Sequence, residues 1–218
     1  NKYVNIHRAT QVKGYVHGVF YGNVLIDTNG SYPQGKGYLS FENDRFSVGS
    51  GRGWYIEDNI FQFNGVDAIL SGAANAGGGY VVRYNTATGT LLGTTTYLET
   101  HGNQPDGIYG PQITEVYGNY VSATGASRAT VVRGGKNRYM NNVFAVGNIA
   151  IWEEYSDLAT SPTYPTGRCP ENQGVARQTC NDSCICQKVH DSYFINNRSS
   201  YTGPVHKATV LMDFEHRE

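Results

Sequence analysis

Five ionisable residues of this chain have the types needed for acid–base chemistry on a sugar chain. Arg133 could serve as the base or as the cation that neutralises a substrate carboxylate, and His101 is an alternative base near neutral pH. Asp106, Glu153 and Glu154 could supply the two carboxylates, about 5–10 Å apart, that glycoside hydrolysis requires. These residues therefore predict either lyase or glycoside hydrolase chemistry.

Three further residues are candidates for substrate binding. Arg83 is a second cation, Glu99 is another carboxylate, and Trp152 offers a ring on which a sugar could stack. Lys136, like Arg83 and Arg133, is also a candidate for the base or the cation of a lyase. Each of these residue types also has a structural interpretation. A His before Gly, as at His101, commonly satisfies the polar groups of a turn. An Arg before Gly, as at Arg133, commonly lies at a solvent-exposed strand edge, and two adjacent Glu residues, as at Glu153, commonly stand in water at the start of a loop.

These residues lie on a repeat that is marked by Asn. A short phrase with a small polar residue at a bend and β-forming residues on both sides recurs about once every 23 to 36 residues. The copies are Phe20-Tyr21-Gly22-Asn23-Val24-Leu25, Ile56-Glu57-Asp58-Asn59-Ile60-Phe61, Val82-Arg83-Tyr84-Asn85-Thr86, Val116-Tyr117-Gly118-Asn119-Tyr120-Val121, Tyr139-Met140-Asn141-Asn142-Val143-Phe144 and, with Ser in the Asn place, Val189-His190-Asp191-Ser192-Tyr193-Phe194. Such a period indicates one unit stacked many times, and its strand chemistry favours a parallel β-helix.

The repeated Asn is predicted to form a ladder. Asn tolerates the left-handed conformation at a bend, and its amide can bond the Asn of the next rung. Asn59, Asn85, Asn119 and Asn142 share one place in the phrase, so we expect them to stack at one corner, inside and hydrogen bonded. Independent turn formers are the alternative.

A second phrase lies between the Asn copies and ends in Gly or a polar loop. It is seen at Arg8–Gly14, Asp67–Gly72, Arg128–Gly134, Ile149–Trp152 and Lys207–Leu211. Insertions at Ser71–Gly79, Gly102–Gln112 and Glu153–Lys188 each follow it, so we expect them to crowd one side of the molecule and to wall a groove.

All four cysteines lie in the last insertion, at about residues 153–188. Cys169, Cys180, Cys184 and Cys186 predict two local disulfides and an oxidising compartment, with the pairing open. A metal site is the rival interpretation, but the spacing Cys180-x3-Cys184-x-Cys186 differs from the paired C-x2-C of structural zinc. No metal is expected there.

Composition restricts the partners. Lys and Arg number 17 against 18 Asp and Glu, and a net charge of −1 argues against nucleic acid. No apolar run approaches the roughly 18 residues of a membrane span. The 27 Gly and 17 Tyr suit a β-rich chain with many tight turns, and the repeat runs through residues 1–218 as a single domain.

The chain resembles the right-handed parallel β-helix proteins of the pectate-lyase-like superfamily. The resemblance rests on the Asn phrases and on Val81–Thr86 followed by Glu99-Thr100-His101-Gly102, and it covers nearly the whole chain. It implies an all-β, right-handed solenoid of about eight rungs with loop insertions on one side. Thr100 stands before His101 where the hydrolases have Gly, there is no Asp-Asp dipeptide, and the carboxylates are scattered. No resident cofactor is expected, and calcium is the one ion that the resemblance implies as a possible ligand.

These observations predict a secreted or cell-surface protein that binds or cleaves an extracellular polysaccharide. The alternative is a non-catalytic structural or adhesive module of a fibre, tailspike or filament. His7-Arg8-Ala9-Thr10 resembles His206-Lys207-Ala208-Thr209, so both ends are expected to be rungs. This predicts either a longer β-helix of which the chain is a part or end-to-end self-association.

Overall fold

Parallel β-structure makes up the described part of the chain. The computed structural model describes residues 1–6, 9–13, 17–28, 31–34, 53–66, 72–74, 79–91, 96–100, 113–122, 124, 128–132, 135–145, 149–152, 189–198 and 210–213. These residues form strands and turns without a helix, and every strand pairing among them is parallel. The prediction of an all-β chain with parallel sheets is confirmed.

Three sheets, here named A, B and C, share the strands. The members of sheet A are β1 (Lys2–Val4), β4 (Val24–Ile26), β7 (Ile60–Val66), β10 (Thr86–Leu91), β13 (Tyr120–Val121) and β16 (Val143–Phe144). The members of sheet B are β2 (Thr10–Lys13), β5 (Ser31–Gln34), β8 (Gly72–Ala74), β11 (Thr96–Thr100), β14 (Arg128–Val132), β17 (Ile149–Trp152) and β19 (Val210–Asp213). The members of sheet C are β3 (Gly18–Tyr21), β6 (Trp54–Glu57), β9 (Gly79–Arg83), β12 (Ile113–Tyr117), β15 (Gly135–Met140) and β18 (Val189–Ile195).

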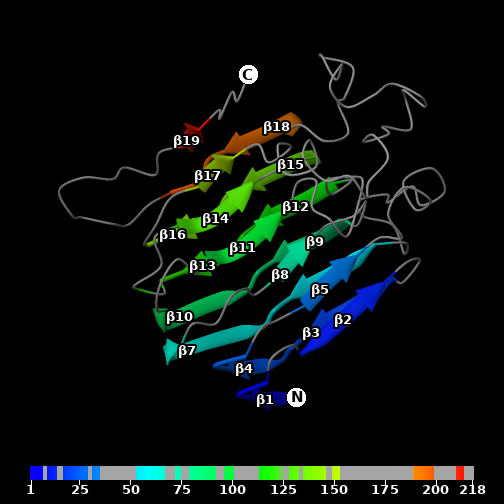
Figure 1. Cartoon of the computed structure of the whole chain (residues 1–218), viewed down its shortest axis with the longest axis vertical. Coiled ribbons are helices and arrows are strands. Elements are labelled where there is room, and N and C mark those ends of the chain that lie inside the picture. The colour runs from blue at the N-terminus through cyan, green and yellow to red at the C-terminus, as the bar shows by residue number, and fades with distance from the viewer. Residues whose placement is uncertain are drawn as a thin grey trace, which may run out of the picture.

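The chain visits the sheets in a fixed order. From β1 to β18 each strand belongs to the sheet after that of its predecessor, so each sheet takes every third strand. We call one passage through sheets A, B and C a circuit. Figure 1 shows the circuits stacked in chain order, from β1 at the bottom to β18 and β19 at the top. This topology is compatible with a parallel β-helix.

The second sequence phrase corresponds to sheet B. Arg128–Val132, Ile149–Trp152 and Val210–Asp213 are neighbouring strands of this sheet, as the repeat predicts. The prediction that Ser71–Gly79 is an insertion is wrong at Gly72–Ala74, because the backbone of these small residues pairs with Leu98–Thr100 as strand β8. The other two predicted insertions each join a strand of sheet B to a strand of sheet C.

Alternating side chains build the core. In sheet A, the register places Leu25, Phe61, Ala87, Val121 and Phe144 side by side, and all five are buried. In sheet C, the corresponding inward column is Phe20, Ile56, Val82, Val116, Tyr139 and Phe194. Burial of each large apolar side chain contributes about 1.5–3 kcal/mol. The residues on either side of each inward position point outward, and sheet C thereby presents the site described next.

Candidate functional site

All five residues that the sequence marks for catalysis lie outside the described part of the chain, namely His101, Asp106, Arg133, Glu153 and Glu154. The four residues predicted to form disulfides, Cys169, Cys180, Cys184 and Cys186, lie outside it as well. The predictions made for them remain predictions.

The predicted binding residues lie on two different sheets. Glu99 and Trp152 are in strands β11 and β17 of sheet B, where only their backbone pairing is described. Arg83 ends strand β9 of sheet C, and Lys136 lies in β15 of the same sheet. The described structure therefore separates Arg83 from Glu99 and Trp152, and the site is built around Arg83.

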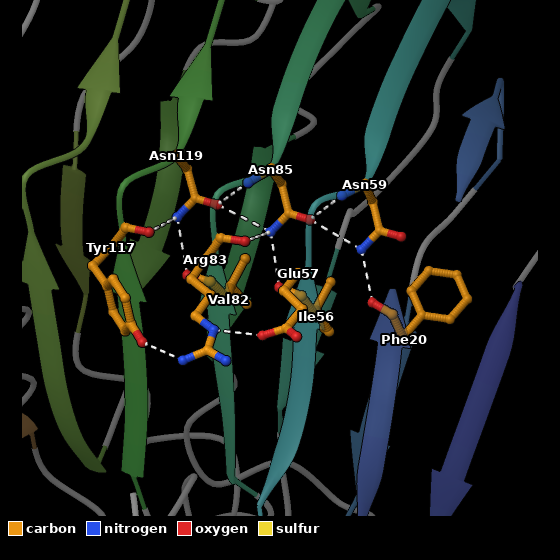
Figure 2. Close-up of polar contacts among 9 residues, drawn as sticks. All are labelled: Phe20, Ile56, Glu57, Asn59, Val82, Arg83, Asn85, Tyr117 and Asn119. Carbon is orange, nitrogen blue, oxygen red and sulfur yellow. Dashed lines mark hydrogen bonds and ion pairs between the residues drawn. The ribbon is translucent and has the colours of Figure 1, made fainter. Parts of the chain in front are cut away.

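The Asn ladder lies beside this site. Asn59, Asn85, Asn119 and Asn142 each stand between a strand of sheet C and the next strand of sheet A, and all four are buried. The side-chain oxygen of Asn85 accepts hydrogen bonds from the backbone N–H of Asn59 at 2.9 Å and from its Nδ2 at 3.0 Å (Figure 2). The same pair of bonds joins Asn85 to Asn119 and Asn119 to Asn142. The predicted ladder is confirmed.

The ladder extends further than the four predicted residues. Asn23 donates to Asn59 Oδ1 at 2.9 Å, and Asn142 donates to Asn197 Oδ1 at 2.8 Å. The assignment of Ser192 to the ladder place is wrong. Ser192 lies within strand β18, where its hydroxyl accepts from the backbone N–H of Asn137, because the register of β15 and β18 shifts between Lys136 and Arg138.

The left-handed residue of each corner is the one before the ladder Asn. The set comprises Gly22, Asp58, Tyr84, Gly118, Asn141 and Asn196, with φ values of 64°, 54°, 58°, 66°, 55° and 50°. The expectation that the ladder Asn itself has this conformation is wrong. The ladder Asn must instead present its backbone N–H and its Nδ2 to the same oxygen of the next Asn, and the preceding residue makes the turn.

The residues two places before the ladder Asn form one outward row on sheet C. Glu57, Arg83 and Tyr117 are the last residues of β6, β9 and β12, and the strand register places them side by side. Their inward neighbours Ile56, Val82 and Val116 are fully buried, so the three polar side chains are directed outward. Figure 2 shows Arg83 between Glu57 and Tyr117.

Arg83 joins its two neighbours through different nitrogens. Its Nε donates to Glu57 Oε2 in an ion pair, and its Nη1 donates to the Tyr117 hydroxyl at 2.8 Å. The hydrogen bond with Tyr117 and the bond with Glu57 raise the pKa of Arg83, and its partial burial opposes them. The guanidinium is therefore charged at every ordinary pH, while its side chain remains 30% exposed.

Three tyrosine rings surround the guanidinium. Its central carbon lies 5.2 Å from the ring centre of Tyr55, 5.8 Å from Tyr84 and 5.9 Å from Tyr117, within the range of cation–π attraction. Tyr84 and Tyr117 meet edge to face, with ring centres 5.5 Å apart and planes at 88°. Tyr84 is 54% exposed, so its ring is available to a ligand.

Gly118 makes room for the exposed ring of Tyr84. The two residues occupy the same corner position in successive circuits. A Cβ atom added at Gly118 would lie 2.7 Å from Tyr84 Cδ1 and 2.8 Å from Cε1, closer than real contacts allow. The glycine therefore lets the ring lie against the backbone of the next circuit.

A second ion pair lies on the same face of sheet C. Arg138 Nη1 donates to Glu115 Oε1 at 2.9 Å, and Glu115 is 5% exposed. No aromatic ring contact of Arg138 accompanies this pair among the described residues, in contrast to the three rings around Arg83. The pair is a natural comparison for mutational tests.

Sequence reasoning selected Arg83 but missed Glu57, Tyr55, Tyr84 and Tyr117. Glu57 and Tyr117 lie 26 and 34 residues from Arg83, so a fixed spacing does not connect them. The signal was nevertheless present, because aligning the copies on the ladder Asn brings Glu57, Arg83 and Tyr117 into one column.

Neither protein-family models, nor curated proteins, nor solved structures show a match to this chain. The described residues contain no group of three or more His, Cys, Asp or Glu side chains placed to hold a metal ion. That part of the chain also has no helix of the length and apolar character needed to cross a membrane.

Proposed function

We propose that the protein is a secreted or cell-surface parallel β-helix, right-handed and with about eight rungs, that binds an extracellular polysaccharide on the outer face of sheet C. The observation that carries the proposal is the partly exposed group formed by Arg83, Glu57 and the rings of Tyr55, Tyr84 and Tyr117, of which Tyr84 is the most exposed. We name it the Arg83 cluster.

The composition of the Arg83 cluster suits a sugar. Tyr rings supply rigid apolar area at a low cost in conformational entropy, and they suit the C–H faces of pyranose rings. A small number of fixed polar groups then sets the orientation of the ligand. The cluster has these groups on adjacent strands, and the Asn ladder directly beside them holds the strand ends rigidly.

Cleavage of the polysaccharide is a further part of the proposal. In a lyase or glycoside hydrolase of this kind, His101 or Arg133 would act on the proton, and Asp106, Glu153 and Glu154 would supply carboxylates. Calcium would then be the ion to add to the assay. The appearance of unsaturated products or of reducing ends separates the two reactions, and binding without either product limits the function to recognition.

Binding is tested by titrating a panel of soluble polysaccharides into the wild type and into two matched variants. Arg83→Lys keeps the charge but removes the planar group that bridges Glu57 and Tyr117, and we expect it to weaken binding at least about tenfold. Arg138→Lys makes the same exchange in the second ion pair and should bind like the wild type. Equal affinities of all three proteins would contradict the proposed site.

A structural or adhesive module is the second candidate function, and the outer face of sheet A favours it. The outward residues of this sheet from β4 to β16 carry no charge; they include Val24, Ile26, Ile60, Gln62, Thr86, Thr88, Tyr120, Ser122, Val143 and Ala145. Ile60 and Tyr120 are each 45% exposed. An uncharged face of this kind is typical of association surfaces.

Sedimentation at increasing protein concentration tests this candidate. A fibre or filament module should associate without any polysaccharide, and Tyr120→Glu, which places a charge in the uncharged face, should abolish lateral association. Association that persists in Tyr120→Glu would instead favour the end-to-end stacking that the sequence predicts. A monomer at every concentration would exclude both forms of self-association.

A further inference from the structure

Each of the two charged residues of the Arg83 cluster has one hydrogen-bonding atom without a partner among the described residues, and a ligand could bond to it. Arg83 uses Nε and Nη1 for Glu57 and Tyr117, and its Nη2 has no hydrogen-bond partner among the described residues (Figure 2). Glu57 uses Oε2, and its Oε1 has no partner within the same part of the chain. The ion pair therefore offers a donor and an acceptor side by side.

The charges of the cluster do not favour an anion. The carboxylate of Glu57 neutralises the guanidinium of Arg83 at contact distance. Glu57 holds its own side chain largely covered, with 16% of it exposed, so the carboxylate stays against the guanidinium. A carboxylate on the ligand would meet one cation already paired with one anion, and its repulsion from Glu57 would offset its attraction to Arg83.

Neighbouring hydroxyl groups of a sugar match this pair of atoms. One hydroxyl can accept from Arg83 Nη2 while the adjacent hydroxyl donates to Glu57 Oε1, since each hydroxyl is both a donor and an acceptor. Hydrogen bonds to charged groups are the stronger kind. The apolar face of the same sugar ring would then lie on the exposed ring of Tyr84, whose centre is 5.8 Å from the guanidinium carbon.

From this geometry we infer that the ligand of the Arg83 cluster is a neutral polysaccharide with adjacent free hydroxyl groups, and that the Arg83–Glu57 pair selects against uronic acids. The inference rests on the proposed polysaccharide-binding function and adds the class of sugar. Of the two cleavage reactions it is compatible with hydrolysis alone, because a lyase acts on a uronic acid. Glu57 is the residue that sets this specificity, because its charge cancels that of Arg83.

Matched pairs of oligosaccharides test the inference most directly. Mannan and mannuronan oligosaccharides, and likewise galactan and galacturonan oligosaccharides prepared with the same anomeric linkage, differ chiefly in a hydroxymethyl group against a carboxylate on each sugar. Calorimetric titration of the wild type should give at least about tenfold tighter binding of the neutral member of a pair. Added salt should leave the neutral affinity nearly unchanged.

Two variants examine the role of the carboxylate. Glu57→Gln keeps an acceptor but leaves Arg83 with its full charge, so it should weaken the neutral ligand about fivefold and strengthen the acidic one, which reduces or reverses the preference. Glu115→Gln removes the carboxylate of the other ion pair on this face and should leave the ratio of affinities as in the wild type.

The possible results separate the inference from the function on which it rests. Tighter binding of the acidic member by the wild type, or an unchanged ratio in a folded Glu57→Gln protein, would overturn the inference and leave polysaccharide binding intact. Binding of neither member of any pair would overturn the proposed function together with the inference.

Discussion

Tyr84 has a backbone conformation that costs free energy for a bulky side chain. Its φ of 58° is in the left-handed region, where the equivalent corners have Gly, Asp or Asn. Strain of this kind persists only where surrounding contacts hold it, and it is often found at functional sites. Here the contacts are the edge of Tyr117 and the guanidinium of Arg83, so the strain places an aromatic ring where a ligand can reach it.

The first prediction separates binding from stability at this residue. Tyr84→Asn introduces the residue type that the chain itself has at positions 141 and 196 of the equivalent corners. We expect the free energy of unfolding to stay constant or rise by up to about 1 kcal/mol, while polysaccharide affinity falls at least about tenfold. Urea unfolding and calorimetric titration measure the two quantities. A large loss of stability would show that the ring is structural.

The second prediction compares two glycines at equivalent corners. Gly118 and Gly22 have φ values of 66° and 64°, so Ala at either place should cost about 1 kcal/mol of stability through backbone strain. Only at Gly118 does the new methyl group meet the Tyr84 ring; nothing lies within 4 Å at Gly22. Gly118→Ala should therefore weaken ligand binding and Gly22→Ala should not. Equal affinities would exclude the Tyr84 ring from the site.

At the scale of the elements, the Asn ladder links the strand ends on which the site depends. Asn85 accepts two hydrogen bonds from Asn59 through its Oδ1, and its Nδ2 donates to Asn119 and to the backbone carbonyls of Ile56 and Arg83. The carbonyl of Arg83 belongs to the central residue of the Arg83 cluster. The ladder therefore fixes the backbone from which the guanidinium extends (Figure 2).

The third prediction is that Asn85→Leu destabilises the fold by about 3 kcal/mol or more. Leu cannot form these bonds, and buried partners left unsatisfied cost about 1–3 kcal/mol each. Asn64→Leu is the control, because Asn64 is an exposed Asn on the neighbouring strand β7. Within the described residues its side chain donates to Asp27 Oδ2, and its backbone N–H, which Leu would keep, donates to Asp27 Oδ1. Asn64→Leu should lower the free energy of unfolding by less than about 1 kcal/mol. Similar losses in the two variants, measured by urea unfolding, would argue against the ladder.

The ladder could be predicted because its signal is local. Each ladder Asn is recognisable by the β-forming residues around it, and repetition at one place in the phrase implies stacking. The assignment of the left-handed residue was wrong because Asn tolerates that conformation as readily as the residues beside it. Ser192 was misassigned because a register shift between β15 and β18 is not encoded in the spacing of the phrase.

The site was predicted less well for a related reason. Glu57, Arg83 and Tyr117 meet through strand register, across intervals of 26 and 34 residues. The length of each interval depends on the segments between strands of sheets B and C, which vary independently of the stacked strands. A side-chain group assembled from three circuits therefore has no fixed motif, and only the ladder Asn provides a common reference point for it.

At the scale of the whole molecule, buried tyrosines connect the three sheets. Tyr97 of sheet B meets Phe61 of sheet A edge to face at 5.9 Å, and the hydroxyl of Tyr139 in sheet C bonds Thr130 of sheet B at 2.9 Å. Both rings are fully buried. Burial raises the pKa of both phenols, although the bond from Thr130 lowers that of Tyr139 in part. The core between the sheets is therefore sensitive to alkaline pH.

The Tyr97 hydroxyl differs from that of Tyr139 in having no hydrogen-bond partner among the described residues. An unpaired buried hydroxyl costs free energy, whereas a paired one contributes about 1 kcal/mol. As the fourth prediction, Tyr97→Phe should leave the stability at neutral pH unchanged or higher, and Tyr139→Phe should lower it by about 1 kcal/mol. Urea unfolding of the two variants decides this, and the reverse order would contradict the assignment of the core contacts.

The fifth prediction concerns the pH dependence of stability. In the folded protein the raised pKa keeps both phenols protonated, whereas the unfolded chain loses these protons near pH 10, to within about a unit. The stability that the neutral phenols contribute is thus fully present below about pH 10 and is lost as pH rises further, by about 1.4 kcal/mol per pH unit for each phenol. Unfolding midpoints measured together with tyrosinate absorbance should show two phenols that ionise only as the strands unfold. Tyr97→Phe should reduce the alkaline slope by the share of one phenol, and ionisation of every tyrosine in the folded protein near pH 10 would contradict the burial of these two rings.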